Sequence, residues 1–202
     1  MTRGRWSSSL CKWILAGLSV VSAFGQASVV RSGSFEVDPF IGASYGIDRF
    51  RVMAGGNVTY AVTKYVLPYF EYSYFPGIPH NISGAGCSAN LSTPLSDIHG
   101  GVHLRLPFSK ESPIVPYLVF GMGVMAYPGR SAAVEGCSPI TSLNFPGGAN
   151  FTINGGGGLR YYLGGSGRFG FRVEAKVYKP VEGPFSNDTI GKVEAGFFFQ
   201  LR

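Results

Sequence analysis

The stretch KVEAGFFFQLR, from Lys192 to Arg202, carries three consecutive phenylalanines beside charged residues that are spaced two apart. Successive side chains of a β-strand point to opposite faces, so alternate residues form one face. One face of this stretch is apolar and the other is mixed: the two sets are Val193, Ala195, Phe197, Phe199 and Leu201, and Lys192, Glu194, Gly196, Phe198 and Gln200. The ending therefore predicts a β-strand with two unlike faces, where most soluble domains have a polar tail.

The same alternation recurs along the chain, for example in IHGGVHLRL at 98–106 and in RFGFRVEAKVY at 168–178. No segment after the first 27 residues shows a sustained helical period. Eight segments have strand patterning: 35–46, 50–63, 67–75, 97–107, 114–127, 150–163, 168–179 and 190–201. Because long connections alternate with short ones, we predict an all-β, eight-stranded antiparallel up-and-down barrel, with short turns at one end and longer loops at the other. The last strand is expected to pair with the first and so close the sheet.

Alternation alone leaves two kinds of barrel open. A soluble, lipocalin-like barrel turns its apolar face inward, whereas a membrane barrel turns it toward lipid. The 14% of charged residues favours the membrane barrel, because soluble domains usually have ~25%. Aromatic residues gather near the expected strand ends, as membrane interfaces require. The polar face is rich in small residues, which suit the narrow interior of an eight-stranded barrel: Gly42, Ser44, Gly55, Gly101, Gly156, Gly158, Gly170 and Gly196.

Residues 1–27 have the pattern of a cleaved secretory signal peptide. Arg3, Arg5 and Lys12 precede the apolar stretch 13–25, and small residues follow it. Cleavage is expected after Gly25 or Ala27, and residues 28–202 are expected to form the barrel alone. The apolar stretch is shorter than the ~20 residues of a membrane-spanning helix, which favours export over anchoring. Removal of three basic residues lowers the formal net charge from +6 to about +3, so the basic composition does not indicate nucleic-acid binding.

Two cysteines remain after the signal peptide is removed. Cys87 and Cys137 lie in the similar contexts AGCSAN and EGCSPI, each within a long connection rich in Gly, Ser, Asn and Pro. An exported protein meets an oxidising compartment, so a disulfide between the two loops is predicted. Two unpaired surface thiols are the alternative.

Charged residues on the polar face are predicted to form a network inside the barrel. They are Arg51, Glu71, Arg105, Arg160, Arg172, Glu174, Lys176, Lys192 and Glu194. In the last hairpin, a register that sets Arg172 opposite Glu194 and Glu174 opposite Lys192 is predicted, because like charges directly opposite each other destabilise a sheet. A register that sets Lys176 opposite Glu194 is the second choice.

With these features the chain resembles the small eight-stranded outer-membrane β-barrel proteins of Gram-negative bacteria, the OmpA/OmpX-like family. That family carries an assembly signal in its last strand, and Glu194, Gly196, Phe199 and Leu201 occupy the corresponding places, although this chain adds Arg202 where the family usually stops on an aromatic residue. The resemblance implies the outer membrane as location. It also implies contact with outer-membrane lipid, lipopolysaccharide and the barrel-assembly machinery, and a monomeric state.

A structural or surface-interaction role is expected, with a lumen plugged by paired charged side chains and an extracellular ligand as partner of the long loops. The alternatives are a narrow channel for small solutes and, less favoured, a lipid A-modifying enzyme. We expect no catalysis, because His99 and His103 fall on the lumen face and no Ser and His pair can be placed on the outer surface. We also expect no cofactor and no metal, because these two histidines lie about 13 Å apart along one strand face.

Overall fold

The computed structural model describes residues 32–47, 49–77, 79–84, 87–106, 112–135, 142–164, 167–181 and 189–201. The predicted signal peptide and Cys137 lie outside these ranges. The signal peptide and the disulfide therefore stay predictions.

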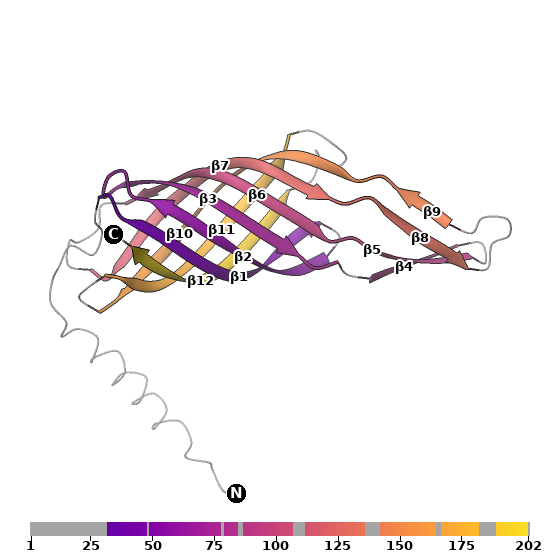
Figure 1. The fold of residues 1–202 in the computed structure, drawn as a ribbon, viewed down its shortest axis with the longest axis horizontal. Helices are drawn as coiled ribbons and strands as arrows, with labels where there is room; N and C mark the ends of the chain where they lie inside the picture. Colours follow the sequence, from indigo (N-terminus) through magenta and orange to yellow (C-terminus); the bar gives the residue numbers. More distant parts are fainter. Residues whose placement is uncertain are drawn as a thin grey trace, which may run out of the picture.

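Eight strands form a closed antiparallel barrel (Figure 1). They are β1 (Phe35–Ile47), β2 (Arg49–Tyr60), β3 (Val66–Phe75), β6 (Leu95–Arg105), β7 (Ile114–Tyr127), β10 (Gly148–Leu163), β11 (Phe169–Pro180) and β12 (Ile190–Leu201). Their order around the barrel is β1-β12-β11-β10-β7-β6-β3-β2, which is the up-and-down arrangement. All eight predicted strands and the all-β, eight-stranded antiparallel barrel are confirmed. The described residues form no helix that is long and apolar enough to cross a membrane.

The strand that contains the three phenylalanines closes the barrel. β12 pairs with β11 on one side and with β1 on the other, where Phe35 lies opposite Leu201 and Tyr45 opposite Gly191. The barrel sheet therefore has no free edge, as a sheet inside a bilayer requires. We call the end that carries Phe35 and Leu201 the terminal end, and the opposite end the loop end.

The two faces of each strand differ sharply in exposure, and β11 shows this best. Phe171, Val173 and Val177 point outward and are about half exposed, whereas Arg172 and Glu174 point into the lumen and are buried. Apolar side chains thus cover the outside of the barrel, and charged side chains fill its inside. This excludes the lipocalin-like alternative, because a soluble barrel would bury its apolar face.

A second sheet, which the sequence pattern does not predict, extends the barrel at the loop end. It consists of β4 (Pro79–Gly84), β5 (Cys87–Ser92), β8 (Arg130–Glu135) and β9 (Ser142–Phe145), in the order β4-β5-β8-β9. We call it the outer sheet, and in Figure 1 it projects away from the barrel on the side opposite the C-terminus. Its strands continue β3, β6, β7 and β10 in the same spatial order. They are short and rich in Ser and Asn, which is why their strand signal is weak.

A proline separates each outer strand from the barrel strand that it continues. The four residues are Pro76, Pro94, Pro128 and Pro146. Proline has no backbone N–H to donate to a strand ladder, so it ends the pairing at each of these points. The four prolines therefore mark a line along which the barrel sheet stops and the outer sheet begins.

The predicted register of the last hairpin is wrong. β11 and β12 pair with Glu174 opposite Glu194 and Lys176 opposite Lys192, which matches neither the first nor the second choice. The prediction counted only charges that face each other on these two strands. In the barrel, Arg172 lies within ion-pair distance of both Glu174 and Glu194. Glu71, from the far wall, pairs with both lysines. A side chain of opposite charge therefore lies beside each pair of like charges. Its attraction compensates the repulsion between the two glutamates and between the two lysines.

Candidate functional site

In the part of the chain that the structure describes, the lumen holds twelve buried charged residues. Six are acidic and six are basic: Glu36, Asp38, Glu71, Asp97, Glu174 and Glu194, and Arg51, Arg105, Arg160, Arg172, Lys176 and Lys192. The formal charges of these twelve side chains cancel. We call this set the lumen network. All nine charged residues named from the sequence belong to it.

Three members of the lumen network were missed. Glu36 and Asp38 alternate with the apolar residues of the first predicted strand, and Asp97 begins the fourth. The alternation that identified the other nine could have identified these three as well.

Arg172 occupies the centre of the lumen network. Its Nη1 lies 2.9 Å from Glu174 Oε2 and its Nη2 lies 2.8 Å from Glu194 Oε1. Its Nε pairs with Asp38. A guanidinium presents donors in a rigid planar fork, so one Arg can serve several carboxylates at once. Arg172 thereby ties together the neighbouring strands β11, β12 and β1.

Glu71 connects the opposite wall of the barrel to this centre. It projects from β3, which lies four places from β11 in the ring of eight strands. Its carboxylate lies 2.7 Å from Lys176 Nζ and 2.6 Å from Lys192 Nζ, and it accepts a hydrogen bond from Asn57 Nδ2 at 3.1 Å. Ion pairs of this kind span the lumen and leave the middle of the barrel filled with side chains.

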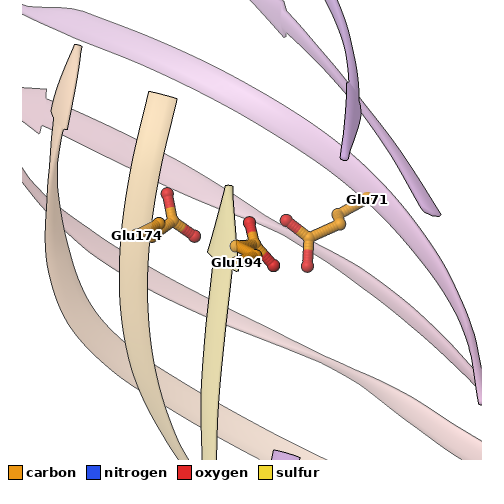
Figure 2. A group of neighbouring side chains, drawn as sticks. All are labelled: Glu71, Glu174 and Glu194. Carbon is orange, nitrogen blue, oxygen red and sulfur yellow. The ribbon is translucent and has the colours of Figure 1, made fainter. Parts of the chain in front are cut away.

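Three glutamates bring their carboxylates together in this region, as Figure 2 shows. One oxygen from each of Glu71, Glu174 and Glu194 lies within 4.8 Å of the others, a spacing that a cation could use. The ammonium of Lys176 already lies there, with its Nζ 2.7, 2.6 and 3.5 Å from the three carboxylates in that order. A metal ion would have to displace it, so the cluster gives no independent support for a metal site.

The terminal end of the lumen contains a separate group of four side chains. Arg105 Nη2 donates to Glu36 Oε1 and to Tyr162 Oη, both at 2.7 Å. Arg160 Nη1 lies 3.4 Å from Glu36 Oε2. We call Glu36, Arg105, Arg160 and Tyr162 the terminal layer. It has two cations and one carboxylate.

His103 lies between the terminal layer and the centre. Its ring stacks on Tyr69 with centroids 4.4 Å apart and packs against Tyr117 at 4.8 Å. Arg160 Nη2 lies 2.9 Å from His103 Nδ1. Arginine has only donors, so Nδ1 accepts and the ring proton belongs on Nε2, which faces Glu174 at 3.5 Å. His103 is therefore held as a neutral packing element.

His99 forms a relay with Asp97 and Thr152 that the sequence pattern does not predict. Asp97 pairs with its Nδ1, and Thr152 Oγ1 lies 2.6 Å from its Nε2. The order carboxylate, imidazole, hydroxyl is that of a catalytic triad. All three side chains are fully buried. No spacing rule links residues on β6 and β10, so only the barrel closure reveals this contact.

An apolar layer lies toward the loop end of the lumen. It consists of Phe40, Met53, Phe75, Leu95, Met125, Tyr178 and Ile190, and Tyr127 packs against it. Phe75 and Leu95 lie opposite each other where β3 and β6 meet the outer sheet. The apolar layer thus stands between the loop end and all of the lumen network except Arg51, which lies two residues nearer the loop end than Met53 on β2. It excludes water from that side, which strengthens the ion pairs behind it.

Arg51 and the four residues of the predicted assembly signal lie in different parts of the barrel. Arg51 is buried on β2 and its Nη1 donates to the carbonyl oxygen of Thr93 at 3.2 Å. Glu194 and Gly196 face the lumen, whereas Phe199 and Leu201 are exposed on the outer face. Glu194 thus has a structural role in the lumen network. The recognition role of the four residues stays a prediction.

The three phenylalanines divide between the two faces of β12. The Phe198 ring is buried in the lumen, with its centroid 4.8 Å from that of Tyr162. Phe197 and Phe199 pack against each other on the outside at 4.8 Å, and Phe171 of β11 joins them at 5.2 Å. The outer rings form an aromatic patch close to the terminal end, where a membrane interface favours aromatic side chains.

Neither a protein-family model nor a curated protein sequence matches the chain. Solved structures do match. Ail, the attachment invasion locus protein of Yersinia pestis, is 11% identical with a TM-score of 0.55, over 85% of this chain and 100% of Ail. Neisserial surface protein A is 12% identical with a TM-score of 0.56, over 83% and 97% of the two chains. OprG, an outer membrane protein of Pseudomonas aeruginosa, is 10% identical with a TM-score of 0.56, over 85% and 97%. The chain thus has the fold of the small eight-stranded outer-membrane β-barrels.

Proposed function

We propose that the protein is an integral outer-membrane β-barrel with a structural or surface-interaction role, and that its lumen is plugged. The filled lumen is the observation that carries this proposal. Twelve buried charged side chains of the described residues occupy it, and the apolar layer covers all of them but Arg51 toward the loop end. An eight-stranded barrel has an interior just wide enough for side chains, so little room is left for a pore.

The location rests on the outer surface of the barrel. Apolar side chains cover that surface on every strand, with Ile41 and Val52 among the most exposed. In this proposal they contact outer-membrane lipid and lipopolysaccharide, and the barrel-assembly machinery inserts the chain. The protein acts as a monomer.

The outer sheet is the part of the described structure that we assign to surface interaction. It projects beyond the barrel at the loop end (Figure 1). In this proposal the loop end faces the outside of the cell, and the terminal end faces the periplasm. Two neighbours in fold are named for attachment or for the surface, the attachment invasion locus protein and Neisserial surface protein A. An epitope inserted into the β8 to β9 connection should be stained on intact cells, whereas one inserted into the β2 to β3 turn should be stained only after permeabilisation.

Planar-bilayer recording distinguishes the plugged barrel from a narrow channel. We expect no stable conductance of nanosiemens size from the refolded protein. A control variant that removes the apolar layer and the central cations together, M125A/I190A/K176M/K192M, tests whether the assay detects an opened lumen. Stable conductance of the unmodified protein would show that the channel alternative is right.

The relay of Asp97, His99 and Thr152 is the one observation that favours an enzyme acting on lipid acyl groups. Its hydroxyl and imidazole lie within hydrogen-bond reach, as an activated nucleophile requires. The proposal of a non-catalytic barrel predicts that lipopolysaccharide from cells with the protein, without it and with Thr152→Val has the same acyl chains by mass spectrometry. Acyl loss that depends on Thr152 would establish the enzyme instead.

A further inference from the structure

The terminal layer has more hydrogen-bond donors than acceptors. Glu36 is its only carboxylate, and it uses its whole acceptor capacity of about four lone-pair sites. Oε1 accepts from Arg105 at 2.7 Å and from Tyr162 at 3.2 Å. Oε2 accepts from Thr59 at 3.2 Å and lies 3.4 Å from Arg160. No acceptor on Glu36 is left for the remaining guanidinium donors.

Arg105 retains donors without a partner. Its Nε and Nη1 are buried and make no hydrogen bond to any described residue, although the residue is only 4% exposed. Arg160 Nε is also buried and makes no hydrogen bond to any described residue. A buried donor that lacks an acceptor costs about 1–3 kcal/mol, and more when it is charged. Such a site therefore favours any small acceptor that can enter it.

The charge of the terminal layer selects the kind of acceptor. Two guanidinium groups face one carboxylate, and the neighbouring His103 is neutral because Arg160 donates to its Nδ1. The other five acidic side chains of the lumen network pair with Arg172, Lys176, Lys192 or His99. The terminal layer thus has a local excess of one positive charge, although the lumen network as a whole is neutral, and this local excess attracts an anion more strongly than a water molecule.

We propose that the terminal layer binds one small inorganic anion of the halide class, held by the Nε and Nη1 groups of Arg105 and by Arg160. A halide accepts hydrogen bonds from several directions and is smaller than an oxyanion. The site lies at the terminal end of the lumen, on the opposite side of the lumen network from the apolar layer. This inference is independent of the surface-interaction role, because a plugged barrel and a channel would both hold the ion.

Chloride dependence of unfolding tests the proposal. The refolded protein is unfolded by urea at constant ionic strength while chloride replaces gluconate. The midpoint should rise with chloride toward saturation, since a ligand that binds only the folded state stabilises it. Glu36→Gln removes the carboxylate that competes with the anion for the guanidinium groups. The chloride concentration that gives half of the maximal rise in the midpoint should therefore fall by about tenfold. Arg105→Gln should abolish the dependence.

Arg51→Gln is the matched control, because it removes the same charge from the other part of the lumen and should keep the chloride response. Crystals of the unmodified protein soaked in bromide provide a second measurement that needs no variant. An anomalous peak within hydrogen-bond distance of Arg105 Nε or Nη1 is expected. A chloride response that survives Arg105→Gln, or bromide-soaked crystals with only water beside Arg105, would overturn the proposal.

Discussion

Glu71 shows how strongly the lumen depends on one side chain. It neutralises Lys176 and Lys192 together, and both ammonium groups are buried. Glu71→Gln leaves them undercompensated, and removal of one partner of a buried ion pair costs about 3–5 kcal/mol. We expect this variant to lower the urea midpoint of unfolding in lipid vesicles, followed by circular dichroism.

The double variant E71Q/K192Q is the control for this effect. It removes one surplus ammonium, so it should unfold at a higher urea concentration than Glu71→Gln alone. A double variant that is no more stable than the single one would show that charge balance does not govern the lumen.

Gly156 and Gly155 are adjacent residues with opposite surroundings. A Cβ on Gly156 would lie 2.1 Å from the carbonyl oxygen of Ala175, whereas a Cβ on Gly155 would lie no closer than 3.7 Å to any neighbour. Gly156→Ala should therefore destabilise the barrel by about 1–3 kcal/mol, the usual cost of overpacking. Gly155→Ala should have no more than a small effect. Urea midpoints measured side by side check this, and equal losses would contradict the assigned lumen face of β10.

At the level of elements, β12 is the strand on which closure depends. Deletion of 197–202 removes its pairing with Phe35 and Val37 of β1 and with Phe169 of β11. Unpaired backbone groups would then face lipid, which costs several kcal/mol per group. We expect no heat-modifiable folded species on gels and no protein in the outer membrane.

Removal of an outer-sheet hairpin is the matched deletion. Replacement of 79–92 by a short Gly and Ser linker leaves the pairing of β3 with β6 intact, from Val66 opposite Leu104 to Phe75 opposite Leu95. This variant should still fold and shift on heating. If the outer-sheet deletion also failed to fold while the β12 deletion folded, the assignment of barrel and outer sheet would be wrong.

The outer sheet gives a new argument for the proposed disulfide. Ser88 of β5 lies opposite Glu135 of β8, and these residues stand one position after Cys87 and two positions before Cys137 in the sequence. We expect the alkylated mature protein to migrate faster without reductant than with it. Cys87→Ser should remove the difference, and free thiols in the untreated protein would contradict the pairing.

The elements also show what the sequence could predict. Period-two alternation located all eight barrel strands, because each has one face toward lipid and one toward the lumen. The sequence pattern does not predict the outer strands, because β9 has only four residues and β4 and β5 are made largely of turn-forming residues. The register of β11 and β12 was predicted wrongly for another reason. It depends on Glu71 and Asp38, which reach the hairpin from β3 and β1.

The molecule as a whole separates its side chains into an apolar exterior and a charged interior that is neutral in sum. The sequence predicted this separation but not its layers. The terminal layer, the centre around Arg172 and the apolar layer each combine residues from at least three strands, and the relay at His99 combines residues from β6 and β10. Such contacts arise only when the sheet closes, so no pattern along one strand contains them.

The direction in which each strand turns its apolar face is the central claim, and methyl NMR of the unmodified protein in bicelles tests it most directly. Leu118 and Val66 are exposed on the outer face, whereas their sequence neighbours Val119 and Leu67 are fully buried in the lumen. Each pair lies at the same depth in the membrane. A lipid-soluble spin label should broaden the methyl signals of Leu118 and Val66 and spare those of Val119 and Leu67. Equal broadening within each pair, or the reverse order, would contradict a barrel that faces lipid with its apolar side and keeps its charges within.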